Sequence, residues 1–296
     1  MASLREVKDR ISSVNSTRKI TSAMKMIASS KLHKAQAAIT NFLPYSQKLD
    51  SILLNLLSSD LGYDSPFSQK REVTKVAIVS FSSNSSLCGA FNANVIKETS
   101  LTYDKLVTEF GAGNVLLYPI GKKIADAAQK NKWNTDDGDY QEMLNVPAYQ
   151  PISDLAKSLI NKFIIGDFDR IILIYHHFKS TSSQVIENKT YLPFDISVVQ
   201  QEAEGHSKGL QFDYIYEPSH DEILTSLIPK VLASRLFAAL LDSVASEHAA
   251  RTIAMQTATD NANDLIQELT IQYNKTRQYA ITNELLDIIG GASALE

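Results

Sequence analysis

Residues 219–290 read SHDEILTSLIPKVLASRLFAALLDSVASEHAARTIAMQTATDNANDLIQELTIQYNKTRQYAITNELLDIIG. This stretch has no glycine before position 290 and one proline, Pro229, so it predicts a single unbroken helix. Ser219 and Glu222 form a capping box at its start, and Gly290-Gly291 favours a left-handed stop at its end. Roughly 70 helical residues span on the order of 105 Å, whereas globular helices average about 11–12 residues. We expect this helix to project from any compact domain and to pack against a partner.

A second long helix is predicted from residue 3 or 4 to about residue 61. Ser3 and Glu6 form another capping box, and Pro44 is a candidate kink. Apolar residues follow helical spacing along it, and we expect them to form a narrow seam. The seam comprises Val7, Ile11, Val14, Ile20, Met24, Ile27, Leu32, Ala35, Ile39 and Phe42.

The two predicted helices carry charges of opposite sign. Residues 1–40 hold eight Lys or Arg and two carboxylates, a net +6, while residues 210–296 hold five basic and twelve acidic residues, a net −7. Alanines at every fourth position from Ala250 to Ala262 let a partner helix approach closely. We therefore expect the helices to pair as a coiled coil, irregular in pitch because the spacing mixes threes and fours. A plain helical bundle is the alternative.

The middle of the chain has the pattern of an α/β domain. Strand-like runs at 75–81, 114–118, 170–177 and 184–187 alternate with helix-like segments at 89–110, 122–132 and 152–165. This alternation predicts a Rossmann-like domain with a parallel or mostly parallel sheet. The chain then divides into a helix (1–61), a linker (62–74), the α/β domain (75–211) and the second helix (212–296).

Composition restricts where the chain works. Its 296 residues carry a net charge of −4, and no run of 18 apolar residues is present, so we expect no transmembrane segment. The charged start, MASLREVK, lacks the features of an export or transit leader. Cys88 is the only cysteine, which excludes an internal disulfide and fits a reducing compartment.

We predict no catalytic, cofactor or metal site. Gly111-Ala112-Gly113 lacks the third glycine of a dinucleotide fingerprint and precedes a strand instead of following one. The loop 82–86 offers amides to an anion, but loops of this composition usually cap the next helix. His176 and His177 are adjacent on a strand, so they point to opposite faces and cannot share a metal.

The remaining reactive residue types have structural interpretations. His248 has Thr252, not a ligand, four residues on, and Cys88 has no basic neighbour in sequence, so we expect a buried structural thiol. The basic first helix has no aromatic residue before Phe42 on which a base could stack. A solvated or partner-facing surface is therefore favoured over nucleic-acid binding.

Three stretches closely resemble the γ subunit of F-type ATP synthases, and the resemblance covers essentially the full length. They are ITSAMKMIASSK (20–31), LCGAFN (87–92) and the terminal helix, chiefly ASEHAAR (245–251), ATDNA (258–262), YNKTRQ (273–278) and ITNEL (281–285). The resemblance implies an antiparallel coiled coil inside a ring of alternating α and β subunits (α3β3). It also implies that the α/β domain sits with the ε subunit on a membrane c-ring, and that ion flow turns the shaft and drives the β sites through different nucleotide affinities.

The same resemblance implies particular contacts and a location. Met24 and Lys25 would face acidic β-subunit residues, Arg277 and Gln278 would hydrogen-bond a β-subunit loop, and the last residues would suit an apolar sleeve. The implied ring contacts are Met24, Lys25, Arg251, Arg277, Gln278, Thr282, Glu284 and Leu295. Met24 is alternatively a seam residue, and Arg251 is alternatively a partner for carboxylates of the first helix. The protein would bind no cofactor, catalyse no bond chemistry, and lie peripherally on the cytoplasmic face of a bacterial plasma membrane.

The sequence departs from the family at one loop. Asn84-Ser85-Ser86 replaces the usual Asp-Arg-Gly, which puts any salt bridge or turn geometry of those residues in question. No cysteine pair is present, so the thiol-regulated insert of chloroplast forms is missing. Two other classes of function stay open at this stage: a static coiled-coil scaffold with an α/β interaction domain, and a nucleotide-dependent enzyme.

Overall fold

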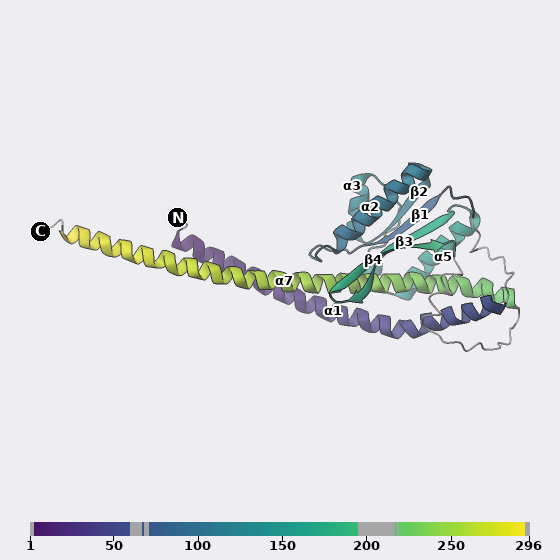
Figure 1. Cartoon of the computed structure of the whole chain (residues 1–296), viewed down its shortest axis with the longest axis horizontal. Helices are drawn as coiled ribbons and strands as arrows, with labels where there is room; N and C mark the ends of the chain where they lie inside the picture. The colour runs from purple at the N-terminus through teal and green to yellow at the C-terminus, as the bar shows by residue number, and fades with distance from the viewer. Residues whose placement is uncertain (1–2, 60–66, 68–70, 195–216, 218, 294–296) are drawn as a thin grey trace. The chain divides into compact units, whose positions relative to one another are not determined.

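The computed structural model describes residues 3–59, 67, 71–194, 217 and 219–293, and the side-chain surroundings of all these except 57–59, 220 and 291–293. The chain forms two compact units, Met1–Ser29 with Arg251–Glu296, and Ser30–Ala250. Two long helices contribute to both units, α1 (Leu4–Ser59) and α7 (His220–Ser293), as Figure 1 shows. Both predicted long helices are therefore present. The boundaries predicted at 61 and 211 lie outside the described residues, so the four-part division stays a prediction.

The unit Ser30–Ala250 contains a four-stranded sheet with the strand order β2-β1-β3-β4. Its strands are β1 (Val76–Phe81), β2 (Val115–Ile120), β3 (Arg170–Ser180) and β4 (Ser183–Leu192). β1 pairs in parallel with β2 and β3, and β4 pairs antiparallel with β3. The predicted mostly parallel sheet is confirmed. The β3–β4 hairpin is longer than the two short runs predicted, because its polar far end is held by cross-strand pairing that an apolar pattern does not reveal.

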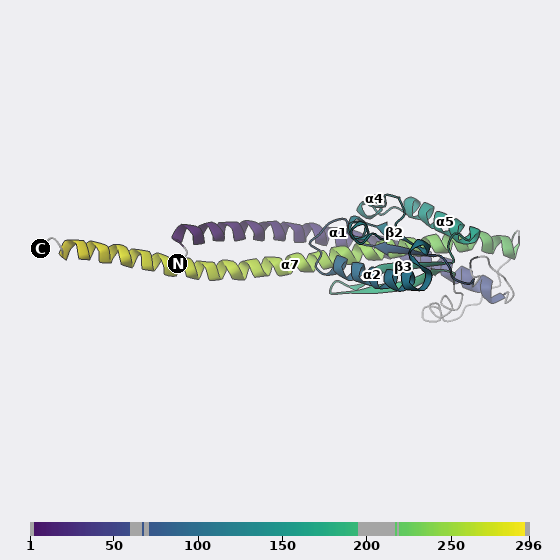
Figure 2. The same ribbon diagram turned by 90° about the horizontal axis from the view of Figure 1, so that it is seen from above.

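Helices cover both faces of this sheet (Figure 2). On one face, α2 (Phe91–Phe110) and α3 (Lys122–Asn131) share a core with Val76 and Ile78 of β1. On the other face, α5 (Tyr149–Ile165) and α7 share a core with Ala77 and Val79. Two short helices, η1 (Ala112–Asn114) and α4 (Glu142–Asn145), lie in the connections. Burial on both faces explains why β1 is apolar except at Ser80, whose hydroxyl lies 2.8 Å from that of Thr99.

The first part of α7 belongs to the core of this unit. Leu232, Leu236 and Leu240 are fully buried, and between Val231 and Glu247 most positions on every side of the helix are buried. A helix that is apolar all round is a buried helix. The sequence predicted a projecting rod, whereas about a quarter of the helix is an interior element of the α/β fold.

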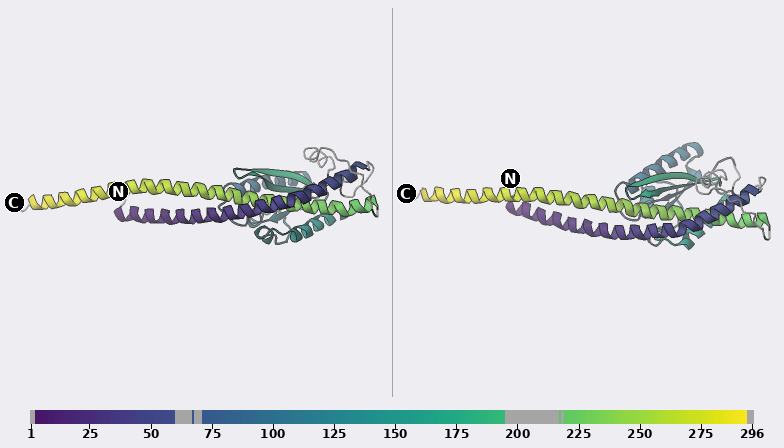
Figure 3. Two further views of the ribbon diagram at one scale, coloured as in Figure 1. Left: turned by 90° about the horizontal axis from the view of Figure 1, so that it is seen from below. Right: turned by 60° about the horizontal axis from the view of Figure 1, so that its bottom comes forward.

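In the unit Met1–Ser29 with Arg251–Glu296, α1 and α7 pair antiparallel (Figure 3). The Thr21 and Thr259 hydroxyl oxygens lie 2.8 Å apart, and Arg18 Nη1 donates to Asn263 Oδ1 over 3.3 Å. The α7 partner number rises as the α1 number falls, which is the antiparallel direction. The predicted coiled coil of the two terminal helices is confirmed.

One stripe of buried and half-buried positions runs along α1 with alternating spacings of four and three residues. It comprises Val7, Ile11, Val14, Arg18, Thr21, Lys25, Ala28, Leu32, Ala35, Ile39, Phe42, Ser46, Leu49, Leu53 and Leu56. This regular heptad replaces the irregular spacing predicted from apolar residues alone. Ile20 and Ile27, predicted in the seam, are 60 % and 59 % exposed, so that prediction is wrong. The heptad that starts at Val7 reaches Thr21 and Ala28 instead.

The helix ends agree with the sequence except at the carboxyl end of α7. Ser3 N donates to Glu6 Oε2 and Glu6 N donates to Ser3 Oγ, both over 3.2 Å, which completes the first capping box. At the start of α7, Glu222 N donates to Ser219 Oγ over 3.4 Å. α1 continues through Pro44, and α7 continues past Gly290 to Ser293. The predicted glycine stop is wrong, because glycine permits a left-handed residue without requiring one.

Two leucines on α7 test whether its buried part stabilises the fold. Leu236→Ala should lower the free energy of unfolding by about 2–5 kcal/mol, because it leaves a cavity in the core. Leu285→Ala removes the same atoms from a side chain that is 54 % exposed and should change stability by less than about 0.5 kcal/mol. Urea unfolding followed by circular dichroism measures both, and equal losses would contradict the burial described.

Candidate functional site

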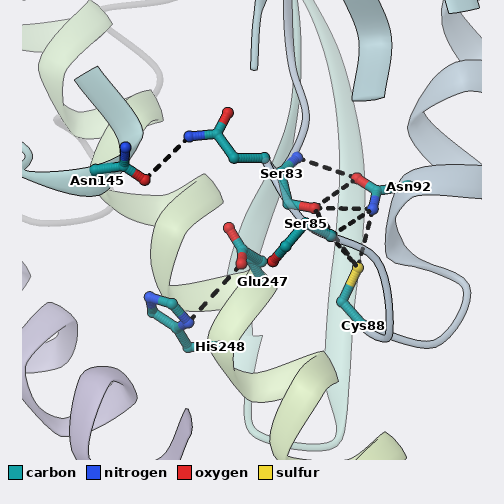
Figure 4. A network of polar contacts seen from close by, with 8 residues as sticks. Ser83, Ser85, Cys88, Asn92, Asn145, Glu247 and His248 are labelled. Atoms are coloured by element: carbon teal, nitrogen blue, oxygen red, sulfur yellow. Dashed lines mark hydrogen bonds and ion pairs between the residues drawn. The ribbon is translucent and has the colours of Figure 1, made fainter. Parts of the chain in front are cut away.

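The loop Ser82–Ser86 after β1 is where the sequence offered amides to an anion. Ser83 N donates to Asn92 Oδ1 over 3.0 Å, and Asn92 Nδ2 donates to Ser83 Oγ over 2.8 Å (Figure 4). Ser83 Oγ also lies 2.7 Å from the Ser85 carbonyl, to which it donates. These contacts join the loop to the first turn of α2. The polar groups of Ser83 and Ser85 are therefore hydrogen-bonded within the protein.

The same loop caps α3. Lys122 N donates to Asn84 Oδ1 and Ile124 N donates to Ser82 Oγ, each over 3.0 Å. These are amides that a helix amino end leaves without an intrahelical partner. Since side chains of the loop accept them, the capping interpretation is favoured over a phosphate site.

Asn84 also answers the question raised by the departure from the family. Its Nδ2 donates to the Gln141 carbonyl over 2.8 Å and to Asn145 Oδ1 over 3.1 Å. An amide side chain thus accepts from α3 and donates to α4, whereas a carboxylate in its place only accepts. In this chain the loop is therefore held by an amide side chain that both accepts and donates.

The adjacent histidines on β3 lie on opposite faces, as predicted. His176 is buried and stacks on the Phe91 ring at 4.3 Å between centroids, and burial lowers its pKa to about 4, so it stays neutral at pH 7. His177 Nδ1 lies 2.6 Å from Asp242 Oδ2 on α7. Burial raises the pKa of the Asp242 carboxyl, and the His177 hydrogen bond opposes that shift. Both histidines therefore join β3 to a neighbouring helix, His176 to α2 and His177 to α7.

Cys88 is buried, and Asn92 Nδ2 donates to its Sγ over 3.0 Å. The predicted structural thiol is thus placed in the polar contacts of the loop. Within the described ranges, no group of three or more His, Cys, Asp or Glu side chains is placed to hold a metal ion.

The residues implied as ring contacts lie at different depths in the unit Met1–Ser29 with Arg251–Glu296. The exposed set is Arg277, Gln278, Thr282 and Glu284, the half-buried set is Met24 and Lys25, and Leu295 lies outside the described residues. Arg251 is only 8 % exposed. Its burial favours the alternative of a contact within the chain.

The outer side of α1 carries large apolar side chains that the sequence assigned wrongly or missed. Ile20 and Ile27 are exposed, and Met26 is 66 % exposed. At about 100° per residue, Ile20 and Ile27 lie within about 20° of each other on one side of the helix. The signal that would have revealed them was the heptad of Val7, Ile11 and Val14, which leaves both isoleucines outside the seam.

The last part of α7 is exposed on all sides. Thr276 is the last half-buried residue, and each following residue to Gly290 is exposed. In the views of Figures 2 and 3 this end continues beyond the amino end of α1. It carries the exposed apolar residues Tyr279, Ile281, Leu285, Leu286, Ile288 and Ile289.

These apolar residues do not form a single stripe. At about 100° per residue, Ile281, Leu285 and Ile288 fall within about 60° of one another, whereas Tyr279 and Leu286 lie about 140–160° away. A single partner helix covers one side only. This arrangement fits a surface that surrounds the helix.

In the part of the chain that the structure describes, one helix is long and apolar enough by composition to cross a membrane. An 18-residue window within Asp221–Gly290 has a mean hydropathy of 1.6, and 61 % of that window is buried inside the protein. A core helix has the same composition, and the burial of most positions on every side between Val231 and Glu247 identifies the apolar part of α7 as such a helix.

Comparison with known proteins gives one consistent family. The family model described as ATP synthase matches residues 3–295. The ATP synthase gamma chain of Phocaeicola vulgatus is 56 % identical over 99 % of this chain and 100 % of its own length. That of Bacteroides fragilis is 58 % identical with the same coverage, and that of Flavobacterium johnsoniae is 44 % identical over 100 % and 99 %.

Solved structures share the fold at lower identity. A chain of the Euglena gracilis mitochondrial ATP synthase (OSCP, F1 and c-ring, rotational state 3) is 19 % identical, with a TM-score of 0.63 over 99 % of this chain and 94 % of that one. A chain of the Tetrahymena thermophila mitochondrial ATP synthase, from the central stalk and c-ring, is 21 % identical, with a TM-score of 0.55 over 81 % and 99 %.

Relatives more than half identical from end to end, and a family model over nearly the whole length, agree with the three stretches on which the resemblance rests. The chain belongs to the gamma subunit family of F-type ATP synthases, the family of the rotating central stalk.

Proposed function

We propose that this gamma chain is the rotating shaft that couples ion flow through a membrane c-ring to ATP synthesis and hydrolysis at an α3β3 ring. The observation that carries the proposal is the end-to-end identity of 56 % with an ATP synthase gamma chain. The chain itself catalyses no bond chemistry in this proposal. It changes the nucleotide affinity of the β sites through the face it turns toward them.

The exposed end of α7 supports this role physically. Apolar side chains on two sides of a helix cost free energy in water, about 25 cal/mol per Å² of apolar surface. Ile281 and Leu286 represent these two sides. A ring that encloses the helix end buries both at once, and a smooth apolar sleeve also lets the helix turn.

The buried part of α7 supports the transmission of torque. The segment from Val231 to Glu247 is held in the core that also contains Ala77 and Val79 of β1. Close-packed interiors deform little, so a rotation of the α/β domain turns this helix with it. The segment is part of one continuous helix, His220–Ser293.

The ring contacts of the shaft are proposed from the family and from exposure. We retain Arg277, Gln278, Thr282 and Glu284 as contacts with α or β subunits, because all four side chains are exposed. Leu295 is retained from the resemblance alone. Arg251 is withdrawn because it is buried.

Two half-buried residues need separate treatment. Met24 is retained as a ring contact, since part of its side chain reaches the surface. Lys25 lies on the buried stripe of α1, so its proposed contact with the ring is limited to the end of its side chain.

The further partners and the location follow from the same proposal. A central stalk stands on the c-ring beside the ε subunit, which makes the chain peripheral to the membrane. In a bacterium this is the cytoplasmic face of the plasma membrane. The static scaffold is not favoured, because the similar relatives are gamma chains of a rotary enzyme. The other alternative, a nucleotide-dependent enzyme, would need saturable ATP binding by the isolated chain.

Removal of the exposed end of α7 tests the shaft. The chain expressed with α and β subunits should purify as one complex with them. Deleting residues 277–296 should leave the melting midpoint of the isolated chain unchanged, because no described residue of 277–290 is buried. ATP synthesis in reconstituted vesicles should fall several-fold.

A full-length control separates the apolar surface from helix length. Ile281→Ser, Leu285→Ser and Ile288→Ser together should lower ATP synthesis in the same direction without shortening the helix. Purification with unrelated proteins only, or full synthesis by both variants, would sink the proposal.

A matched pair of methionines tests the contact at Met24. Met24→Lys should impair coupling more than folding, because it adds a cation where the family places acidic β residues. Met26→Lys makes the same chemical change at a more exposed position and should affect coupling less. Ions pumped per ATP hydrolysed is the measurement. Failure of the Met24→Lys chain to assemble would instead identify Met24 as a seam residue.

A further inference from the structure

The buried stripe of α1 is polar over one section. Arg18, Thr21 and Lys25 occupy three successive stripe positions, between apolar residues at Val14 and Ala28. Thr21 is 9 % exposed, and the two cations are half-buried. We call these three residues the polar section. Polar residues in a coiled-coil seam cost stability, and their known benefit is the choice of partner and register.

On α7, neutral hydrogen-bonding groups meet Arg18 and Thr21 of the polar section. Arg18 donates to Asn263, and the Thr21 hydroxyl contacts that of Thr259. Thr21 Oγ1 also lies 3.0 Å from the Arg18 carbonyl, and Thr259 Oγ1 lies 2.8 Å from the Met255 carbonyl. Two hydroxyl protons serve these three contacts, so one hydroxyl donates across the helices and the other donates to a carbonyl of its own helix. Each hydroxyl keeps a partner in either arrangement.

A second copy of α1 would meet the polar section with like charges. In a parallel pair, Arg18 faces Arg18 and Lys25 faces Lys25. In an antiparallel pair centred near Thr21, Arg18 faces Lys25. Both orientations bring cations together in a seam that excludes much of the water, where like charges repel most strongly.

We infer that Arg18, Thr21 and Lys25 make α1 select α7 and reject a second copy of itself. The need arises from the order of synthesis, since α1 ends about 160 residues before α7 begins. Until α7 is made, the apolar stripe positions before Ser30 (Val7, Ile11, Val14 and Ala28) lack the segment of α7 with which they form a compact unit. During this interval the polar section keeps α1 from pairing with the α1 helix of another nascent chain. The inference does not depend on the rotary role.

Mixed refolding of the full-length chain tests this inference. Two batches with different affinity tags are unfolded together in urea, refolded, and captured through one tag, and the second tag is then measured. Wild-type chains should give only background. The seam variant Arg18→Leu, Thr21→Val, Lys25→Leu should raise the captured second tag about tenfold or more, because each like-charge contact costs a kcal/mol-scale penalty that the variant removes.

The matched control places the same changes on the outside of α1. Arg10→Leu, Thr17→Val and Lys19→Leu alter exposed residues and remove the same charges and hydroxyl. It should stay near the wild-type background. If the control variant captured as much of the second tag as the seam variant, the effect would come from added surface hydrophobicity, and the inference would be overturned. A seam variant that refolds with a higher urea midpoint but stays at background would overturn it too.

A single conservative change covers the case in which the seam variant does not fold. Lys25→Met keeps an unbranched side chain and removes one cation. It should raise mixed capture above background, by less than the triple variant. A background value for a folded Lys25→Met chain, judged by near-ultraviolet circular dichroism, would then overturn the inference.

Discussion

The burial of α7 on every side between Val231 and Glu247 is the constraint on which the rest of the molecule depends. This segment packs against one face of the sheet, and α2 and α3 pack against the other face. The core of the α/β domain is therefore complete only when the last helix of the chain is in place. The fold therefore joins the end of the chain to its middle through nonlocal contacts. The same burial removes the freedom of the helix to rotate within the domain, which is the mechanical property that a shaft requires.

The hydroxyl-rich loop after β1 and the two adjacent histidines of β3 hold elements of the fold together. The hydroxyl-rich loop caps α3 and contacts α2, His176 is a neutral stacked ring, and His177 joins the sheet to α7 through Asp242. The replacement of the family's Asp-Arg-Gly by Asn84-Ser85-Ser86 shows the same tendency. The Asn84 amide both accepts from α3 and donates to the Gln141 carbonyl, so in this chain it joins the loop to the elements that follow it.

The sequence predicted the long helices, the alternating middle and the family, because long periodic patterns and ungapped motifs contain many independent observations. It placed the strands of the sheet but not the extent of the β3–β4 hairpin, whose far end is polar. The sequence-based prediction was wrong for apolar residues that could belong either to the seam between the two helices or to the exposed side of α1. Ile20 and Ile27 fit a seam by hydrophobicity, and only the strict heptad, which places Thr21 and Ala28 inside, shows that they face outward. Arg251 was expected at the ring from the family resemblance, and its burial favours the alternative of a contact within the chain, which depends on neighbours that one sequence does not reveal.

The exposed apolar end of α7 has a consequence for the economy of the cell. A chain with Ile281, Leu285 and Ile288 uncovered on one side and Leu286 on the other is prone to aggregation whenever it outnumbers the rings that enclose it. Its unpartnered turns are also open to proteases. A supply of this chain matched to that of the subunits that enclose it would keep these side chains covered. The exposed apolar surface of this helix end thus favours matched expression of the genes for this chain and for the subunits that enclose it.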